Sequence, residues 1–424
     1  MNIEIQRGRL IDPSSGVDRV TPLYIANGRI ASVTEAPPGW HAERVIDARG
    51  LIIAPGFVDI AVRLREPGFE YKATLESEMD AALAGGVTSL ACPPDTDPPL
   101  DEPGLVEMLK ARARARGGAN VYPIGALTVQ LQGAALSEMC ELAEAGCVAF
   151  SQADVALPDT QVLHRAMQYA ATFGLALWLR PQDAHLAKGG VAHDGAVATR
   201  LGLPGIPAAA ETIAIATILT LMRDTGARVH LCRLSTAEGV ALVRAAKKGG
   251  LPLTCDVAIH HMHLSEIDIG WFDPQAHLAP PLRSTRDRAA LRTGLADGTI
   301  DVICSDHAPV DDDGKQVPFA EAEPGATGLE LLLPLTLKWA AEEKVKLPVA
   351  LAKITSAPAK VLAVEAGQLT VGSAADLCIF DPDAFWTVER TTLKSQGKNT
   401  PFLNLEVTGK IRWTLVAGQV VCEV

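Results

Sequence analysis

The chain has 424 residues, of which 48% are hydrophobic and 21% charged, and this composition excludes a disordered protein because it supplies a large core. Fifty acidic residues against 38 basic ones give a net charge of −12, which argues against nucleic acid or an anionic membrane as a general partner. Even the apolar run 213–222 is interrupted by two threonines, whereas a membrane span needs about 18 to 20 apolar residues.

The N-terminal sequence and the cysteines indicate where the protein works. Glu4, Arg7 and Arg9 stand where a signal peptide would have its apolar segment, so we expect a cytoplasmic protein. Eight cysteines are scattered without a C-x-x-C pair and lie mostly in apolar runs, which favours reduced thiols over disulfides.

Both ends of the chain are rich in predicted strands. Residues 23–26 and 29–33 flank Asn27-Gly28, a two-residue hairpin signal. After Gly372, short apolar runs again alternate with turns up to residue 421. The pattern predicts one small β-sandwich made from residues 1–53 and 365–424, with residues 54–364 as a separate domain.

Within that middle domain, apolar runs of about six residues alternate with stretches of helical periodicity. The runs predict strands at 57–62, 87–92, 120–126, 146–151, 176–180, 228–233, 252–257 and 299–305. Helices are expected between them, for example over 74–83, 105–116 and 209–223, each followed by glycine. Eight strands with helical crossovers indicate an α/β fold of the TIM-type (β/α)8 barrel class, in which functional residues stand at the strand ends.

Motifs at those strand ends and beyond resemble the dihydroorotases of the amidohydrolase superfamily. The resemblance extends over most of the chain and implies the same barrel and ancestry. It rests on P-G-F-V-D-I (55–60), L-R-E-P-G (64–68), S-D-H-A-P (305–309), G-L-E (328–330), S-A-P-A-K (356–360), G-S-A-A-D-L (372–377) and G-K-N-T-P-F (397–402).

The resemblance also implies a zinc site that this chain has lost. Members of the family open or close a cyclic amide with zinc held by histidines and carboxylates from several strands. Only Asp306, ligand and general base in the family pattern, matches. The other ligand positions correspond to Ala61, Arg63, Gln152 or Ala153, Arg180 and Arg233, so we expect no bound metal and no other cofactor.

Substrate recognition is altered in the same way. Arg65, which the resemblance assigns to the substrate carboxylate, is present, but two asparagines of the pattern are replaced by Asp95 and Ala279. The histidine after D-H-A-P in the pattern is Val310. An anionic substrate would now face the carboxylate of Asp95.

Other residues could in principle rebuild a metal site. His261 and His263 would share one face of an extended segment next to His260, yet a structural role is favoured for all three. His230 is expected to make hydrogen bonds at the N-terminal side of the barrel, and His307 to be a loop residue. Cys232 and Cys304 are expected to be small core residues rather than nucleophiles.

The arginines at former ligand positions suggest another use for Asp306. A guanidinium carries a permanent charge and five donors, so it can replace the positive charge of a metal beside a carboxylate. We therefore expect Arg63, Arg65, Arg180 and Arg233 to point into one space and at least one of them to pair with Asp306. For Arg65 two roles stay open: binding of a ligand, or packing and charge pairing with Glu66 or Asp306.

A disabled site on an intact barrel resembles the non-catalytic dihydroorotase-like chain that some bacteria assemble with aspartate carbamoyltransferase. The resemblance implies a pseudoenzyme of pyrimidine biosynthesis, partnered by the catalytic chain of that transferase and itself a homo-oligomer. Two alternatives stay open: an active amidohydrolase with an altered metal site, and a regulatory module that binds an anion in the old pocket. Metal analysis separates the first alternative from the pseudoenzyme.

Overall fold

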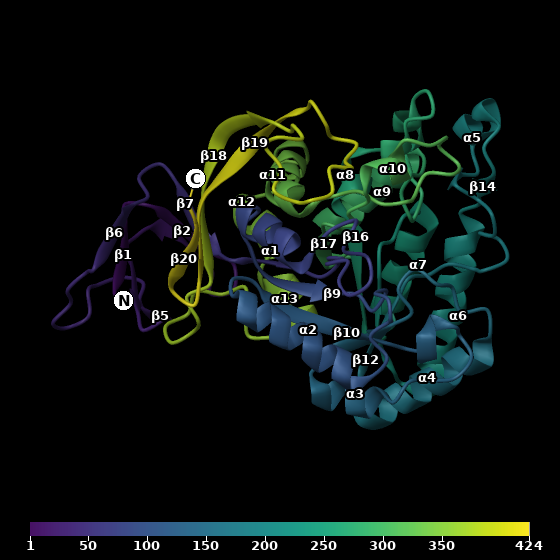
Figure 1. Ribbon diagram of the computed structural model, residues 1–424, viewed down its shortest axis with the longest axis horizontal. Helices are drawn as coiled ribbons and strands as arrows, with labels where there is room; N and C mark the ends of the chain where they lie inside the picture. The colour runs from purple at the N-terminus through teal and green to yellow at the C-terminus, as the bar shows by residue number, and fades with distance from the viewer. Residues whose placement is uncertain (424) are drawn as a thin grey trace.

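The computed structural model describes residues 1–423, and its largest element is a barrel of eight parallel strands surrounded by helices (Figure 1). Neighbouring strands pair in the order in which they follow along the chain. A bridge between Val62 and His307 joins the ends of the first and last strands. The strands are β8 (Phe57–Asp59), β9 (Val87–Cys92), β10 (Asn120–Ala126), β11 (Ala149–Ser151), β12 (Ala176–Leu179), β15 (Arg228–Leu231), β16 (Leu253–Ala258) and β17 (Val302–Cys304).

All eight predicted strands are therefore confirmed, two of them with the predicted bounds. The run predicted for β16 is shifted by one residue, and the other five runs are longer than the paired strands, because their outer residues leave the ladder and enter the loops. Those loop residues carry the candidate site.

The expected helices are also present, and their ends follow local signals. Thr74 caps α1 by accepting from the Ser77 amide, and Gly226 ends α6 in the left-handed conformation, which glycine adopts without strain. The helices are α1 (Leu75–Ala84), α2 (Pro103–Arg116), α3 (Met139–Ala145), α4 (Thr160–Phe173), α5 (Ala196–Leu201), α6 (Ala209–Thr225), α7 (Ala237–Lys248), α8 (Ile259–His263), α9 (Thr285–Ala296), α10 (Asp312–Lys315), α11 (Leu332–Glu342), α12 (Leu347–Ala352) and α13 (Ser356–Leu362).

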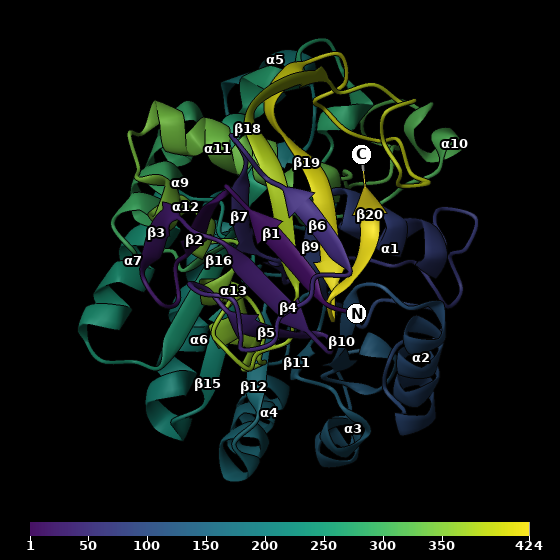
Figure 2. The same cartoon turned by 90° about the vertical axis from the view of Figure 1, so that its left-hand side faces the viewer.

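The two ends of the chain form two sheets beside the barrel (Figure 2). One sheet has the order β5-β4-β1-β6 and the other β20-β19-β18-β7-β2-β3, so strands from both termini share the second sheet. The strands are β1 (Ile3–Gln6), β2 (Arg9–Asp12), β3 (Val17–Val20), β4 (Leu23–Ala26), β5 (Arg29–Ser32), β6 (Arg44–Asp47), β7 (Ile52–Pro55), β18 (Leu377–Thr387), β19 (Glu406–Val416) and β20 (Gln419–Glu423). The exact boundaries of the two domains stay a prediction.

Buried side chains from both sheets, among them Ile3, Ile25, Ile53 and Leu377, form a core separate from that of the barrel. A much larger core lies between the barrel strands and the surrounding helices. Each of the eight cysteines is a free thiol. In the part of the chain that the structure describes, no helix is long and apolar enough to cross a membrane.

Candidate functional site

Three arginines and three aspartates bind one another at the mouth of the barrel, where the strands end. Arg63, which follows β8, donates from Nε to Asp95 Oδ2 at 2.7 Å, from Nη2 to Asp154 Oδ2 at 2.7 Å and from Nη1 to Asp306 Oδ1 at 3.3 Å. Six residues take part in these contacts, and we call them the mouth network: Arg63, Asp95, Asp154, Arg180, Arg233 and Asp306.

The other two arginines converge on the same carboxylates. Arg233, beyond β15, donates to Asp306 Oδ1 at 3.0 Å and to Asp154 Oδ1. Arg180, beyond β12, forms an ion pair with Asp154 Oδ1 at 3.1 Å. The side chains of all three arginines are 6 or 7% exposed, so three positive charges are buried against three negative ones. The expected pairing of Asp306 with an arginine is confirmed, and it involves two of them.

The nearness of opposite charges shifts the pKa values of Asp154 and Arg63. Burial would raise the pKa of Asp154, but Arg233 and Arg63 outweigh it and hold that pKa far below its usual range. Burial would likewise lower the pKa of Arg63, yet Asp95 and Asp154 outweigh it and the pKa is raised. Asp154 and Arg63 are therefore both fully charged, and each neutralises the other.

Arg65 forms no ion pair with the aspartates of the mouth network in residues 1–423, although the charges of Asp95 and Asp154 act on it. Its Nε donates to the Pro309 carbonyl at 2.9 Å, and no hydrogen bond links it to Glu66 or Asp306 within the described chain. Burial and the charge of Arg63 lower the pKa of Arg65. Two residues beyond Arg63, its side chain reaches the loop after β17 and binds the backbone there.

The end of β11 supplies a carboxylate that the sequence comparison missed. Gln152 accepts from Thr128 and donates to the Leu131 carbonyl, so this amide serves a neighbouring loop. Ala153 packs in a small apolar cluster. The next residue, Asp154, enters the mouth network. The sequence did offer a signal for it, because Asp154 is an acidic residue directly after the two replaced ligand positions, Gln152 and Ala153.

Four strand-end residues of the mouth have left-handed backbone conformations. They are Arg65 (φ 60°), Ala153 (φ 50°), Arg233 (φ 57°) and Asp306 (φ 46°). Non-glycine residues adopt this region rarely, and such strain concentrates at functional sites. Backbone strain of this kind at four positions of the mouth marks it as a candidate functional site.

The former ligand positions do not fit zinc. Ala61 has no donor atom, and a guanidinium keeps its protons and offers no lone pair to a metal. Little space is left for a substrate, because the cavity lined by Arg63, Arg233 and Asp306 measures about 30 Å³. Pockets for small molecules usually measure about 300–1,000 Å³.

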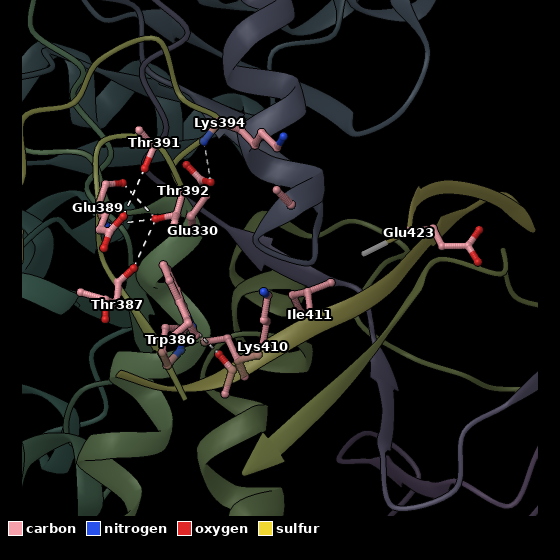
Figure 3. Close-up of a pocket in the computed structure, with 14 residues that line it drawn as sticks. Glu330, Trp386, Thr387, Glu389, Thr391, Thr392, Lys394, Lys410, Ile411 and Glu423 are labelled. Atoms are coloured by element: carbon pink, nitrogen blue, oxygen red, sulfur yellow. Dashed lines mark hydrogen bonds between the residues drawn. The ribbon is translucent and has the colours of Figure 1, made fainter. Parts of the chain in front are cut away.

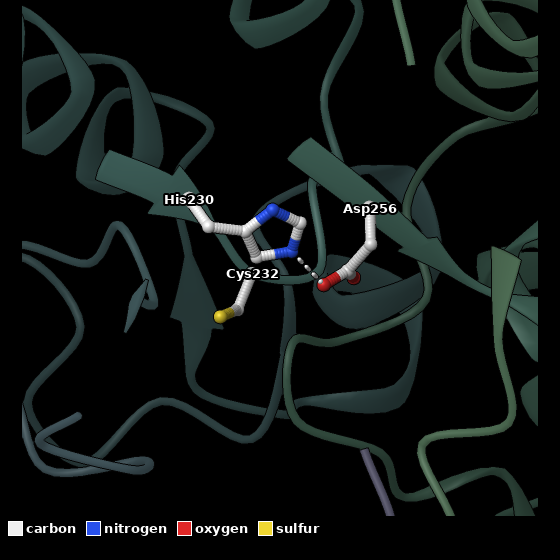
Figure 4. Close-up of side chains that lie close together, drawn as sticks. All are labelled: His230, Cys232 and Asp256. Carbon is white, nitrogen blue, oxygen red and sulfur yellow. Dashed lines mark hydrogen bonds and ion pairs between the residues drawn. The ribbon is translucent and has the colours of Figure 1, made fainter. Parts of the chain in front are cut away.

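Below the mouth network, His230, Cys232 and Asp256 bring one nitrogen, one sulfur and one oxygen within 4.8 Å of one another (Figure 4). These types can bind a metal, but their atoms are engaged. His230 contacts Thr254 through Nδ1 and Asp256 through Nε2, both at 2.8 Å, and Asp256 also accepts from the Arg233 amide. Burial raises the pKa of the Cys232 thiol well above its usual value, which disfavours the thiolate that binds metals. The expected hydrogen-bonding role of His230 is confirmed.

His307 is more than the loop residue that the sequence suggested. It is fully buried, its Nε2 lies 2.5 Å from Glu78 Oε2, and its Nδ1 accepts from the Gly328 amide. Glu78 also accepts from Ser395 Oγ and so links the first helix to the loop before β19. His307 therefore fixes the loop that carries Asp306.

The three clustered histidines form the short helix α8, not the extended segment expected. His261 contacts the Pro280 carbonyl at 3.1 Å and His263 the Leu335 carbonyl at 2.9 Å. Both ring nitrogens of His260 are buried without a partner in the described chain, and its ring stacks on Phe402. These contacts support the structural role that was favoured for them.

His260 should make the fold sensitive to acid. Burial lowers its pKa from 6.5 to about 3. The unfolded chain therefore binds a proton below pH 6.5 that the folded chain does not, so stability falls as the pH falls through this range. At pH 5 the loss is about 2 kcal/mol. The free energy of unfolding, measured in urea, should fall between pH 8 and pH 5 by about 2 kcal/mol more in the parent than in His260→Leu.

The matched control is His41→Leu at an exposed histidine, which should leave the slope of stability against pH unchanged. Equal slopes for His260→Leu and the parent would contradict the assignment.

A larger cavity of about 570 Å³ lies away from the mouth, between β18, β19 and α11 (Figure 3). Its wall includes Glu330, which accepts from the amides of Lys394 and Ser395. Burial raises the pKa of Glu330 to about 7. The wall carries both acidic residues, such as Glu389 and Glu423, and basic residues, Lys394 and Lys410. This mixed charge favours neither anions nor cations as ligands.

Comparison with known proteins decides the family. A family model described as dihydro-orotase-like matches residues 50–239, and one described as amidohydrolase family matches residues 190–422. A dihydroorotase-like protein of Pseudomonas putida is 46% identical over 99% of both chains. The chain is a dihydroorotase-like member of the amidohydrolase family.

Further relatives agree with this assignment. A protein of Geobacter metallireducens named dihydroorotase is 41% identical over 99% of both chains. Among solved structures, an L-hydantoinase from Arthrobacter aurescens superposes with a TM-score of 0.89 at 25% identity and covers 99% of this chain and 96% of its own. The family resemblance and the expected barrel with terminal sheets are thereby confirmed.

Proposed function

We propose that this dihydroorotase-like chain is a pseudoenzyme with an assembly role. The mouth network carries the proposal, because it fills with paired charges the place where the family needs a metal, a water and a cyclic amide. The remaining 30 Å³ is room for about one water molecule. Arginines at three former ligand positions offer a metal no lone pair.

The proposed partner is the catalytic chain of aspartate carbamoyltransferase, in complexes where this chain is itself an oligomer. Support comes from the resemblance to the non-catalytic chain of such complexes and from the loss of the zinc ligands on a preserved fold. An intact barrel without the zinc ligands fits a role in binding a partner protein rather than in catalysis. Function on this fold must be argued from its surfaces and sites, because the fold alone does not specify it.

The first test is of metal and turnover. Protein purified and washed with a chelator should hold no stoichiometric zinc and should neither make nor open dihydroorotate, because its ligand positions lack donors. Elemental analysis and an absorbance assay at substrate saturation measure both, with a zinc-dependent dihydroorotase as the positive control. One zinc per chain together with turnover would refute the pseudoenzyme.

The second test is of the partner. When the catalytic chain of aspartate carbamoyltransferase is expressed with this chain, the two should purify as one complex, and omission of this chain should lower the stability or activity of the transferase. Sedimentation and the rate of carbamoylaspartate formation report the two effects. A transferase of the same size and rate in both preparations would contradict the assembly role.

One observation favours a second candidate, an amidohydrolase with an altered metal site. His230, Cys232 and Asp256 are the only such group found in residues 1–423. If the protein does hold a metal, Cys232→Ser should remove it, whereas Asp306→Asn should remove a metal from the mouth. Binding of an anion at the mouth is disfavoured, because all three arginines of the network already pair with carboxylates.

A further inference from the structure

A second cavity lies at the opposite end of the barrel, where β12, β15 and β16 begin. Its volume of about 550 Å³ is in the range of small-molecule sites, about 300–1,000 Å³. Figure 2 views the barrel from the side of the terminal sheets, and β12 and β15 lie below those sheets in this view. We call this cavity, lined among others by Arg228, Thr254, Lys353, Ala357, Lys360 and Val361, the basal pocket.

The charge of the basal pocket is positive. Arg228, Lys353 and Lys360 line it, and the one acidic residue of its wall, Asp301, is bound by Lys247 at 2.5 Å and by the Cys255 amide at 2.8 Å. This is unusual in a chain of net charge −12. A cavity lined by one sign of charge concentrates ions of the opposite sign.

These cations keep donors available. Arg228 uses one nitrogen on the Gly174 carbonyl, and Lys353 uses one proton on the Ile300 carbonyl at 2.8 Å. A guanidinium has five N–H donors and an ammonium three, so both retain others. Lys360 is exposed, and its ammonium group makes no hydrogen bond or ion pair with residues 1–423.

Apart from His230 and Thr254, the rest of the wall is mostly apolar. Val229 and Leu253 are buried, and Leu251, Ala357 and Val361 are partly buried beside them. An inorganic ion would leave these side chains in water, whereas an anion with an apolar body would cover them. The wall therefore fits a compound with one charged end and one apolar end.

The basal pocket is also joined to the mouth by buried hydrogen bonds. Thr254 of its wall contacts His230, His230 contacts Asp256, and Asp256 accepts from the amide of Arg233 at 2.7 Å. Arg233 belongs to the mouth network. A ligand in the basal pocket would thus lie against one end of this chain of hydrogen bonds.

We infer that the basal pocket binds a small organic anion, with a phosphate or carboxylate held by Arg228, Lys353 and Lys360 and an apolar body against the barrel. The inference does not depend on the proposed assembly role. A molecule that binds only the folded chain stabilises it, by an amount that grows with the logarithm of its concentration above Kd.

Phenyl phosphate is a suitable probe because it combines a phosphate with a flat apolar ring. Calorimetric titration of the full chain should show one saturable site per chain at up to millimolar concentration. Inorganic phosphate lacks the ring and phenol lacks the phosphate, so both should bind more weakly than phenyl phosphate. Titration with benzoate tests whether a carboxylate can replace the phosphate.

Lys360→Glu reverses an exposed charge in the basal pocket without removing a structural contact, and it should weaken phenyl phosphate at least tenfold, or about 1.4 kcal/mol. The matched control is Lys188→Glu, the same change in an exposed loop after β12, which should leave the affinity unchanged. No saturable binding, or equal losses in both variants, would overturn the inference, as would inorganic phosphate binding as tightly as phenyl phosphate.

Discussion

Asp306→Ala should destabilise the fold by about 3 to 5 kcal/mol, because removal of one carboxylate from a buried network of ion pairs leaves an excess of buried positive charge on its arginines. Asp306 Oδ1 accepts from Arg233 at 3.0 Å and from Arg63 at 3.3 Å, and both arginines are almost fully buried. In a zinc-dependent amidohydrolase the same substitution would chiefly abolish turnover. Here we expect the loss in the free energy of unfolding in urea.

Two further variants separate charge from backbone effects. Asp306 has φ 46°, and asparagine tolerates this conformation better than alanine. Asp306→Asn should therefore keep the backbone and still lose stability, by less than the alanine variant. Asp18→Ala breaks the exposed pair with Arg9 and should cost about 1 kcal/mol or less. If Asp306→Ala unfolds at the same urea concentration as the parent, the mouth network does not stabilise the fold.

The double variant Ala61→His with Arg63→His should fail to restore zinc and should destabilise the protein as well. Arg63 binds three aspartates at once, so its loss leaves an excess of buried negative charge. Arg180 and Arg233 would still stand at two other ligand positions, and a zinc site needs about three or four converging ligands with oriented neighbours. We expect a destabilisation of about 3 to 5 kcal/mol.

Arg63→Lys is the matched control for this experiment. It keeps the charge but not the planar fork that reaches several carboxylates, so its stability should lie between those of the parent and the double variant. Elemental analysis and urea unfolding of all three proteins give the comparison. Stoichiometric zinc in the double variant, or stability equal to that of the parent, would show that the mouth can be returned to a metal site by two residues.

The amino-acid sequence alone determined the barrel and its order of elements. Periodic apolar runs predicted β9 and β10 with their observed bounds, and glycines marked the ends of α1, α2 and α6. These signals are local, because side-chain alternation and helix capping depend on residues a few positions apart. The replaced zinc ligands were also visible, since each is a residue type within a motif.

Only the tertiary structure decided which charges meet. Asp95, Asp154 and Arg63 come from three different strand ends, and their distances depend on barrel closure rather than on spacing in the chain. Arg65 and Arg63 looked equivalent in sequence, yet one donates to a backbone carbonyl and the other to three carboxylates. Local patterns set the elements, whereas pairing of buried charges is a long-range property set by how the strand ends converge.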